Sequence, residues 1–281
     1  AVRGKEGNEI KMEAENTAKN EKKSFTILGV SIWRIFAYFI IYSVIGYIIE
    51  TLFGMVTKGV WESRQSFLYG PFCSIYGVGA VVMVLGLQKF NKNNYTLFAG
   101  GFVIGSVVEY VISFIGEWFF HIKWWDYSTM PFNINGRICV CFSLFWGILA
   151  IYLMTYVHPR IEKFLDKINP KALKPITIVL TIFIFVDFVV TGFALKMFYV
   201  RLVKNYNLDI QGVEDYIDEY TKIYEEPRMK EFIDKYFSDE KMLKTFPNIK
   251  VTKKDGNVIW ICDILKHIQP YYVKVFTPQL R

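Results

Sequence analysis

The sequence predicts an all-α polytopic membrane protein that carries a small α+β soluble domain after its last span. Hydrophobic residues make up 53% of the 281 residues and aromatic residues 18%, and the mean hydropathy is +0.25. The apolar residues are gathered in long runs, and a helix of about 20 such residues crosses a bilayer. Because lipid offers no hydrogen-bond partner to a backbone amide, each run is expected to be a helix.

Five runs approach this length, and we expect about five transmembrane helices. The predicted spans are residues 35–56, 70–87, 95–120, 138–157 and 176–200. They divide the chain into a disordered polar leader, a transmembrane helical domain and a small soluble C-terminal domain. These three parts are placed at residues 1–30, 31–202 and 203–281.

The net charge of +7 is distributed in a way that favours a membrane protein over a nucleic-acid-binding protein. Residues 203–281 hold 13 basic and 13 acidic residues, so the whole excess lies in residues 1–202. Lys and Arg gather before the first span and after the second and fourth spans, which is the positive-inside pattern. We therefore expect a multi-pass protein of the cell membrane with a cytoplasmic N-terminus and, after five spans, an extracellular C-terminal domain. The lipid bilayer is an expected partner and nucleic acid is not.

The C-terminal domain is predicted to contain helices and a β-hairpin. Val213, Tyr216, Ile217 and Tyr220 recur at helical spacing. Two short apolar runs flank an Asp-Gly pair at residues 255–256, which is typical of a hairpin turn. The chain contains no GxxxxGK[ST] segment, so it is not expected to bind ATP through a P-loop.

The first four spans are predicted to form a parallel repeat of helical hairpins, with spans one and two repeated as spans three and four. Gly46 precedes Glu50 by four residues, so the two share a helix face. Gly105 precedes Glu109 in the same way. The second and fourth spans also begin alike, at residues 70–77 and 136–143. Repeats of this kind often place a binding site at their interface, and chance recurrence of Gly and Glu is the alternative.

Four acidic residues lie inside the apolar runs. They are Glu50, Glu109, Glu117 and Asp187. A charge near the bilayer centre costs about 2.5–3.5 kcal/mol on insertion scales, so these carboxylates are expected to face the bundle interior or a cavity. Intramembrane carboxylates usually mark pathways or relays, and Glu50 and Glu109 are the leading candidates. The alternative is that an Arg neutralises a buried Glu for stability alone.

The two connections predicted to lie outside the cell, the first outer connection (residues 61–73) and the second outer connection (residues 124–137), carry further candidate residues. Trp and Tyr are ordinary at the membrane interface, but this does not explain the charged and amide side chains among them. Arg presents a planar fork suited to carboxylate or phosphate. Arg64 is a candidate partner of Glu50. Arg137 is a candidate partner of Glu109, and either Arg could instead receive an anionic headgroup or substrate. The candidates in these connections are Arg64, Tyr69, Trp125, Asp126, Tyr127, Asn133 and Arg137.

No metal or cofactor site is expected. The four cysteines are Cys73, Cys139, Cys141 and Cys262. No CxxC pair or Cys/His cluster has the spacing of a zinc site. Small apolar packing residues are the simpler interpretation of these cysteines.

Three of the segments above together resemble a known family. Residues 64–76, the run Trp125-Asp126-Tyr127-Ser128 and residues 133–147 are similar to the putative type IV ABC-transporter permease family of bacteria, also called CmpB-like. The resemblance covers roughly residues 35–200. Ser74 stands where Pro is expected in the family.

The resemblance implies an integral membrane protein with a role in transport. Phe246-Pro247-Asn248 in the C-terminal domain is also similar to the family. Because the chain has no nucleotide-binding motif, transport would need a separate ATPase subunit. Residues 158–174 would then be a short coupling helix, or equally an interfacial helix that lies flat on the membrane.

Three functions are compatible with the sequence. The first is a transporter permease or substrate-binding membrane subunit, in which Glu50 and Glu109 line the path and two arginines lie at its outer mouth. The second is an intramembrane enzyme acting on lipid-like substrates, with Asp126, Glu109 or Glu117 as general base. The third is a membrane assembly protein whose outer domain recruits a partner, and self-association into a homo-oligomer is also open. The lack of a strong catalytic motif favours a non-enzymatic function.

Overall fold

The computed structural model of the protein describes residues 25–89, 93–120, 123, 125–268 and 272–274. Most of the predicted polar leader therefore lies outside the described residues, and so does Trp124. The end of that leader forms a short antiparallel hairpin of β1 (Thr26–Ile27) and β2 (Val30–Ser31). Gln88 donates a side-chain hydrogen bond to the carbonyl of Leu28 in this hairpin.

Four of the described helices are long and apolar enough to cross a membrane. They are α2 (Ile32–Lys58), α4 (Asn94–Phe120), the continuous helix Val140–Asp166 and α7 (Pro170–Tyr206). The third of these consists of α5 (Val140–Tyr152), the π-helical turn η1 (Leu153–Val157) and α6 (His158–Asp166). These helices are the predicted first, third, fourth and fifth spans.

The predicted second span forms a shorter apolar helix, α3 (Ser74–Leu87). Residues 70–73 are not helical. Gly70 has a φ of +78° there, and Pro71 follows it. The 14 residues of α3 rise about 21 Å, less than the roughly 30 Å hydrocarbon core. The count of five full spans therefore stays a prediction.

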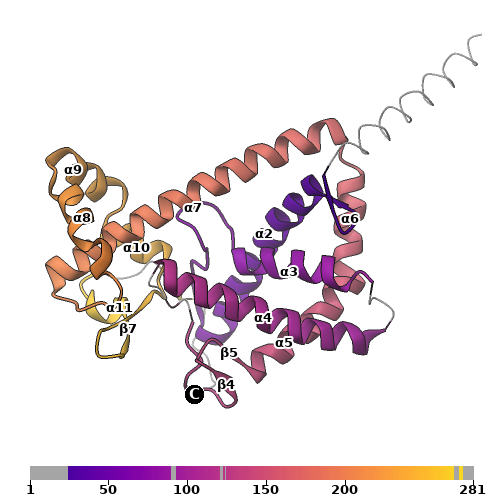
Figure 1. Cartoon of the computed structure of the whole chain (residues 1–281), viewed down its shortest axis with the longest axis horizontal. Coiled ribbons are helices and arrows are strands. Elements are labelled where there is room, and N and C mark those ends of the chain that lie inside the picture. Colours follow the sequence, from indigo (N-terminus) through magenta and orange to yellow (C-terminus); the bar gives the residue numbers. More distant parts are fainter. Residues whose placement is uncertain (1–24, 90–92, 121–122, 124, 269–271, 275–281) are drawn as a thin grey trace, which may run out of the picture.

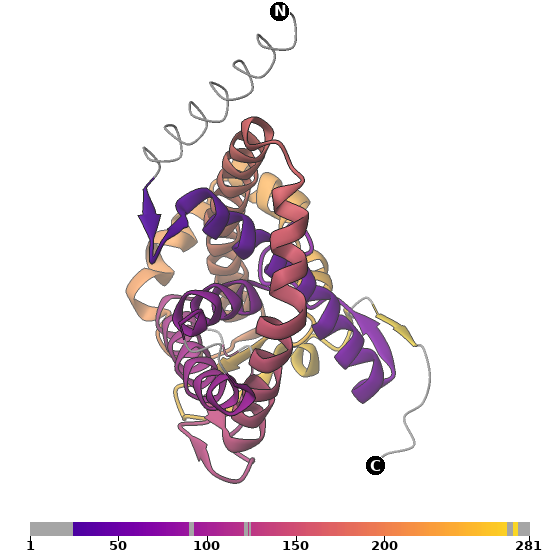
Figure 2. The same ribbon diagram turned by 90° about the vertical axis from the view of Figure 1, so that its right-hand side faces the viewer.

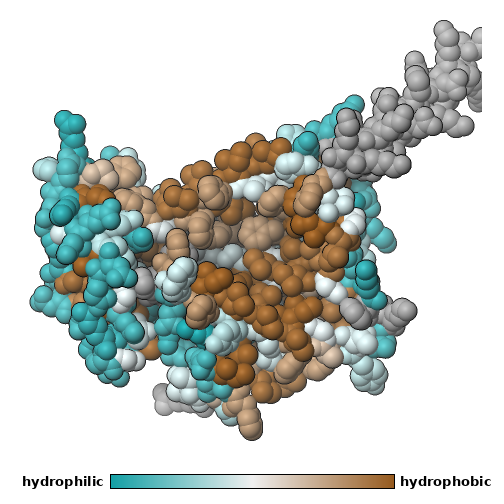
Figure 3. Space-filling view, viewed as in Figure 1, coloured by the Kyte–Doolittle hydropathy of each residue, from teal (hydrophilic) through white to brown (hydrophobic). Residues whose placement is uncertain are grey.

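The helices form an elongated molecule with two polar ends. In Figure 1, α6 and the β1–β2 hairpin lie at one end and the C-terminal domain lies at the other. In Figure 2 the α6 end faces the viewer, and the C-terminal domain lies behind the helices. Figure 3 shows apolar side chains across the middle of the molecule and hydrophilic ones towards both ends, as a multi-pass membrane protein requires.

The last helix, α7, belongs to both the membrane domain and the C-terminal domain. Its 37 residues rise about 55 Å, well beyond the thickness of the hydrocarbon core. Met197, Phe198, Tyr199 and Val200 are fully buried in a core shared with the C-terminal domain. The final part of the predicted fifth span is thus covered by protein. Composition could not predict this, because lipid and a protein core select the same apolar residues.

The C-terminal domain packs short helices and a hairpin around the end of α7. Its elements are α8 (Glu214–Glu225), α9 (Pro227–Tyr236), α10 (Asp239–Thr245), β6 (Lys250–Thr252), β7 (Val258–Trp260) and α11 (Ile261–Ile264). The predicted hairpin is present, with Val251 opposite Ile259. A last strand, β8 (Tyr272–Lys274), pairs antiparallel with β3 (Val60–Glu62), which directly follows α2. The domain is therefore tied to the first outer connection.

The segment expected to be a separate coupling or interfacial helix mostly continues the fourth span. Residues 158–166 form α6, which follows η1 without a break. Leu165 on α6 is 2% exposed. Arg34 of α2 forms ion pairs with Asp166 and Glu162, and Tyr38 donates a hydrogen bond to Glu162. The apolar face of α6 therefore packs against the bundle.

Each predicted hairpin contains the same kind of close helix contact at a glycine. A Cβ added at Gly46 would lie 2.2 Å from the Cβ of Tyr76, and one added at Gly105 would lie 2.4 Å from the Cβ of Trp146. Gly77 and Gly147, each one residue later, meet the carbonyls of Phe39 and Phe98. The contact residues in the first helix of each hairpin, α2 and α4, are 59 positions apart in the sequence, as predicted. In the second helix the offset is 70 rather than 66. The repeat itself stays a prediction.

Candidate functional site

A cavity of about 290 Å³ lies where α2, the connection before α3, the second outer connection and the C-terminal domain meet. Its polar lining is Glu50, Ser63, Arg64, Gln65, Ser66, Ser74, Thr245 and Asn248. Its aromatic lining is Phe53, Trp125, Tyr127, Phe142 and Phe246. Segments that are far apart in the sequence therefore share one cavity, which we call the outer cavity.

Glu50 lies on α2 and contributes its carboxylate to the outer cavity. The hydroxyl of Tyr76 donates a 2.9 Å hydrogen bond to its Oε1. Among the described residues, Oε2 has no hydrogen-bond partner and no cation forms an ion pair with Glu50. Gly46, one turn earlier, lets the Tyr76 ring approach the helix. The Gly-to-Glu spacing thus has a physical reason, because Gly admits the aromatic ring and Glu accepts its hydroxyl.

Arg64 pairs with Glu62 rather than with Glu50, which corrects the predicted pairing. Its Nη2 lies 2.7 Å from Glu62 Oε1, and Lys58 Nζ lies 3.1 Å from the same oxygen. Asn248 of the C-terminal domain donates a 3.0 Å hydrogen bond to that oxygen. Glu62 is 8% exposed, so two cations and an amide compensate one buried carboxylate. Sequence reasoning missed Glu62, although it stands only two residues before Arg64.

Glu109 is enclosed by protein and does not line the outer cavity. It is 3% exposed. Tyr127 donates a 2.9 Å hydrogen bond to its Oε1, and the indole of Trp146 donates a 3.1 Å hydrogen bond to its Oε2. Both partners are neutral, so the predicted pairing of Glu109 with Arg137 is not what the structure has.

Tyr127 connects Glu109 to the outer cavity. Its ring stacks on Phe142 at a centroid distance of 4.7 Å and lines the cavity. Burial and the nearby Glu109 carboxylate raise the pKa of the Tyr127 hydroxyl well above its usual value. The hydroxyl therefore stays protonated at neutral pH and acts as a fixed donor to Glu109.

Arg137 is the partner of Glu117. The Nη2 of Arg137 lies 2.5 Å from Glu117 Oε2, and Lys123 lies 3.8 Å from the other oxygen. Arg137 also donates to the hydroxyl of Ser113 and lies over the ring of Phe114. This pair joins the end of α4 to the second outer connection. For Glu117, the structure therefore matches the alternative stated above, in which an Arg neutralises a Glu of an apolar run.

Asp126 and Asn133 hold the second outer connection together. The backbone amide of Ser128 donates a 3.0 Å hydrogen bond to Asp126, and that of Gly136 donates one of 3.0 Å to Asn133. Partial burial would raise the pKa of Asp126, but the hydrogen bonds from Ser128 and the charges of Lys123 and Lys250 together keep this pKa below its usual value. The connection contains the short hairpin of β4 (Asn133–Ile134) and β5 (Ile138–Cys139).

Asp187 holds the first outer connection against α7. The backbone amide of Tyr69 lies 3.2 Å from both carboxylate oxygens of Asp187. Thr191, one turn later, accepts a 2.8 Å hydrogen bond from the amide of Leu68. Asp187 and Tyr69 are thus joined to each other, and neither lines the outer cavity.

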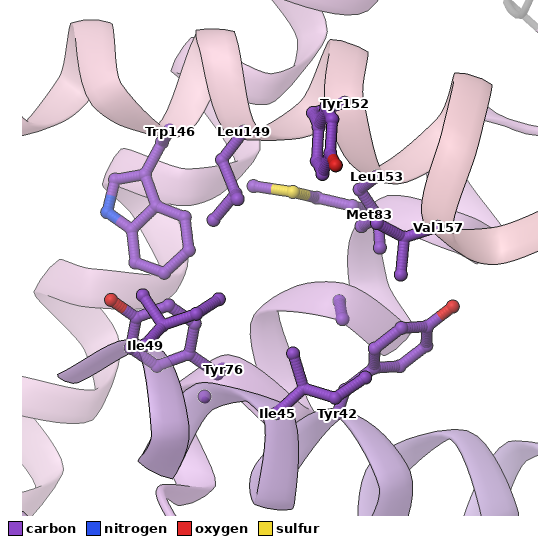
Figure 4. Close-up of a pocket in the computed structure, with 12 residues that line it drawn as sticks. Tyr42, Ile45, Ile49, Tyr76, Met83, Trp146, Leu149, Tyr152, Leu153 and Val157 are labelled. Carbon is purple, nitrogen blue, oxygen red and sulfur yellow. The ribbon is translucent and has the colours of Figure 1, made fainter. Parts of the chain in front are cut away.

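A second cavity, of about 120 Å³, lies between the two helical hairpins (Figure 4). Most of its lining is apolar, and we call it the inner cavity. Tyr76 and Trp146 face each other at one side of it, and Tyr42 and Val157 lie at the other. The hydroxyl of Tyr42 is 2.9 Å from His158 Nδ1.

The two cavities lie next to each other along the bundle. Ile49 and Tyr76 line the inner cavity, while their sequence neighbours Glu50 and Ile75 line the outer one. The rings of Tyr76 and Trp146 are 5.6 Å apart. These two rings, which we call the aromatic layer, both line the inner cavity, and the Tyr76 hydroxyl donates a hydrogen bond to Glu50 of the outer cavity.

The outer cavity brings together four of the predicted site residues. They are Glu50, Arg64, Trp125 and Tyr127. The other predicted residues lie elsewhere, namely Tyr69, Glu109, Glu117, Asp126, Asn133, Arg137 and Asp187. Sequence reasoning missed Glu62, Tyr76, Trp146 and Asn248. Tyr76, Trp146 and Asn248 lie inside segments that carry the family resemblance, whereas Glu62 does not. No group of three or more His, Cys, Asp or Glu among the described residues could hold a metal ion.

Comparison with known proteins confirms the resemblance. A sequence model of the family described as "Putative ABC-transporter type IV" matches residues 37–192. This range is more than half of the chain and runs from α2 into α7. The segment Thr245–Ile249 of the outer cavity lies beyond it. No curated protein matches the chain, and no solved structure does.

Proposed function

The chain belongs to the family described as "Putative ABC-transporter type IV", and from this premise we propose that it is the substrate-binding membrane subunit of a transporter. One observation carries the proposal, which is the outer cavity. There Glu50, Arg64 and Tyr127 come together from separate segments beside the C-terminal domain. A cavity with a few polar groups among aromatic side chains is the usual form of a small-molecule site.

The inner cavity supports a route through the bundle. A solute leaving the outer cavity would meet the layer of Tyr76 and Trp146 and then the inner cavity. Within each hairpin, close contacts at Gly46 and Gly105 pack the two helices tightly together. Opening of the aromatic layer would therefore come from movement of one hairpin against the other, as in transporters built from repeats.

We propose that a separate ATPase binds at the α6 end, opposite the C-terminal domain. The sequence has no P-loop, so the energy of ATP would have to come from a partner. Arg160, Lys163 and Lys167 lie in or directly after α6, and the positive-inside pattern places such residues in the cytoplasm. The C-terminal domain and the outer cavity would then face the outside of the cell.

The contacts of the acidic residues favour transport over catalysis. Glu117 is engaged by Arg137, and Asp126 accepts a hydrogen bond from its own turn. Glu109 is enclosed by two donors. Each candidate general base is thus occupied by a structural contact, and none of them lines the outer cavity.

Reconstitution of the full chain in liposomes tests the proposal. Uptake of a panel of labelled small solutes would be measured with an ATPase co-purified from the source membrane, and also with an imposed proton gradient. The variant Ser63→Trp narrows the outer cavity and should abolish the uptake. The variant Thr129→Trp, at an exposed position outside the cavity, should leave it unchanged. Absence of both a co-purified ATPase and any driven uptake would overturn the proposal.

A further inference from the structure

We propose that the outer cavity binds a small organic cation that carries an ammonium group, with Glu50 as its counter-ion. This inference rests on the proposed function, because it names the class of substrate that the same cavity would admit. It depends on which charged side chains around the cavity have a partner and on the aromatic side chains of its wall.

The first step concerns the charge of Glu50. Within the described part of the chain, its hydrogen-bond partner is the neutral hydroxyl of Tyr76, and no ion pair compensates it. An ionised carboxylate away from bulk water is costly unless a cation or several donors accompany it. By contrast, Glu62 forms ion pairs with two cations, and Glu109 accepts hydrogen bonds from two donors. Glu50 is therefore the group that a bound cation would satisfy.

The second step concerns the cation in the cavity wall. Arg64 already donates to Glu62 at 2.7 Å. Its guanidinium also packs against α2, where a Cβ at Gly54 would lie 2.9 Å from Nη2 and 3.2 Å from Nε. The Nε atom is buried, so a ligand in the cavity does not reach it in this conformation. Arg64 is thus directed to Glu62, which it shares with Lys58, and it forms no ion pair with Glu50.

The third step concerns the aromatic wall. Phe53, Trp125, Phe142 and Phe246 line the cavity together with Tyr127. Aromatic rings attract a cation over their faces, and the attraction grows when water is excluded. The Trp125 indole is oriented by a 2.9 Å hydrogen bond to the carbonyl of Arg137. A carboxylate beside several aromatic rings is the chemistry that recognises an organic ammonium group.

Calorimetric titration of the full chain in lipid nanodiscs at neutral pH tests the inference. The probes are 2-phenylethylammonium, the neutral 2-phenylethanol and the anion phenylacetate, which share an aromatic body and differ in charge. The ammonium probe should bind most tightly. Its affinity should fall about 10- to 100-fold in Glu50→Gln, the range expected for loss of one charged contact.

Two further variants keep the result interpretable. Glu50→Asp retains the charge and should restore part of the affinity that Glu50→Gln loses. Glu219→Gln changes an exposed Glu on α8 and should bind the ammonium probe as tightly as the unaltered chain. Equal or tighter binding of the alcohol or the anion would overturn the inference, and so would unchanged binding in Glu50→Gln.

The outcome separates this inference from the proposed function. If solutes are driven into liposomes but the ammonium probe does not bind through Glu50, the substrate class is wrong and the transport proposal stands. If the probe binds through Glu50 but neither ATP nor a proton gradient drives uptake, the cation site stands and the transport proposal is wrong.

Discussion

The hydroxyl of Tyr76 reaches across from α3 to donate a 2.9 Å hydrogen bond to Glu50 on α2. The indole of Trp146 reaches Glu109 on α4 in the corresponding way, at 3.1 Å. In both cases a glycine one turn before the Glu lets the aromatic ring lie against the helix. The two contacts differ in what surrounds them, because Glu109 is enclosed and Glu50 faces the outer cavity.

The first prediction concerns the glycine beneath Tyr76. The variant Gly46→Ala should destabilise the protein by about 1–3 kcal/mol, the usual cost of overpacking. The added Cβ would lie 2.2 Å from Tyr76 Cβ, so the helices must move apart. Thermal unfolding in detergent measures the effect.

Gly79 of α3 is the matched control for Gly46. The Cβ in Gly79→Ala would meet Trp146 at an ordinary 3.6 Å, so the better helix propensity of Ala should leave stability unchanged or slightly raised. Equal melting temperatures for the two variants would show that the Gly46 contact is not tight.

The second prediction concerns the buried carboxylate that joins the first outer connection to the C-terminal domain. Glu62→Gln should lower the free energy of unfolding by about 1.5–3 kcal/mol, because Lys58 and Arg64 lose a charged acceptor. Chemical unfolding in detergent measures it. The control Glu225→Gln removes an exposed partner of Lys204 and should cost at most about 1 kcal/mol. A smaller loss for Glu62→Gln than for the control would contradict the role of Glu62.

The third prediction concerns the contact of Asn248 with the first outer connection. Asn248→Ala removes the hydrogen bonds that join Asn248 to Glu62 and Lys58. Residues 245–249 should therefore move away from the first outer connection more readily. Hydrogen–deuterium exchange should become faster in this segment while the rates in α2 stay the same. The variant Asn257→Ala, at an exposed position in the β6–β7 turn, should leave exchange at 245–249 unaltered. Unchanged protection in Asn248→Ala would mean that other contacts hold the segment.

The fourth prediction concerns acid sensitivity at the second outer connection. The pKa of Asp126 lies below its usual value in the folded protein, so the ionised carboxylate contributes stability above the unfolded pKa of about 3.9. That contribution is lost as the pH falls through the folded pKa. The difference in melting temperature between the unaltered chain and Asp126→Asn should therefore be constant near neutral pH and shrink as the pH falls from about 4 to 3. A constant difference over this range would contradict the prediction, and Asp218→Asn on exposed α8 serves as the control.

Local sequence predicted the elements of the fold well. Long apolar runs predicted the membrane helices, because lipid allows an isolated apolar chain to pair its amides only as a helix. The Asp-Gly pair at 255–256 predicted the β6–β7 hairpin, because that turn needs a residue with positive φ, and Gly256 has a φ of +83°. The same reasoning could not predict that Pro71 and Gly70 delay the start of α3, or that the end of α7 is covered by protein.

By itself, the sequence determined which residues needed partners. An acidic residue within an apolar run is costly in lipid, so Glu50, Glu109 and Asp187 were expected to face the bundle interior or a cavity. Which partner each one found was decided only by the tertiary structure. Arg64 forms an ion pair with Glu62, and Glu109 accepts hydrogen bonds from the side chains of two aromatic residues. The cost of placing a charge in an apolar run can be inferred from the local sequence. The side chains that compensate the charge are brought close only by folding. In the outer cavity, the residues that lie near Glu50 include some almost 200 positions further along the chain.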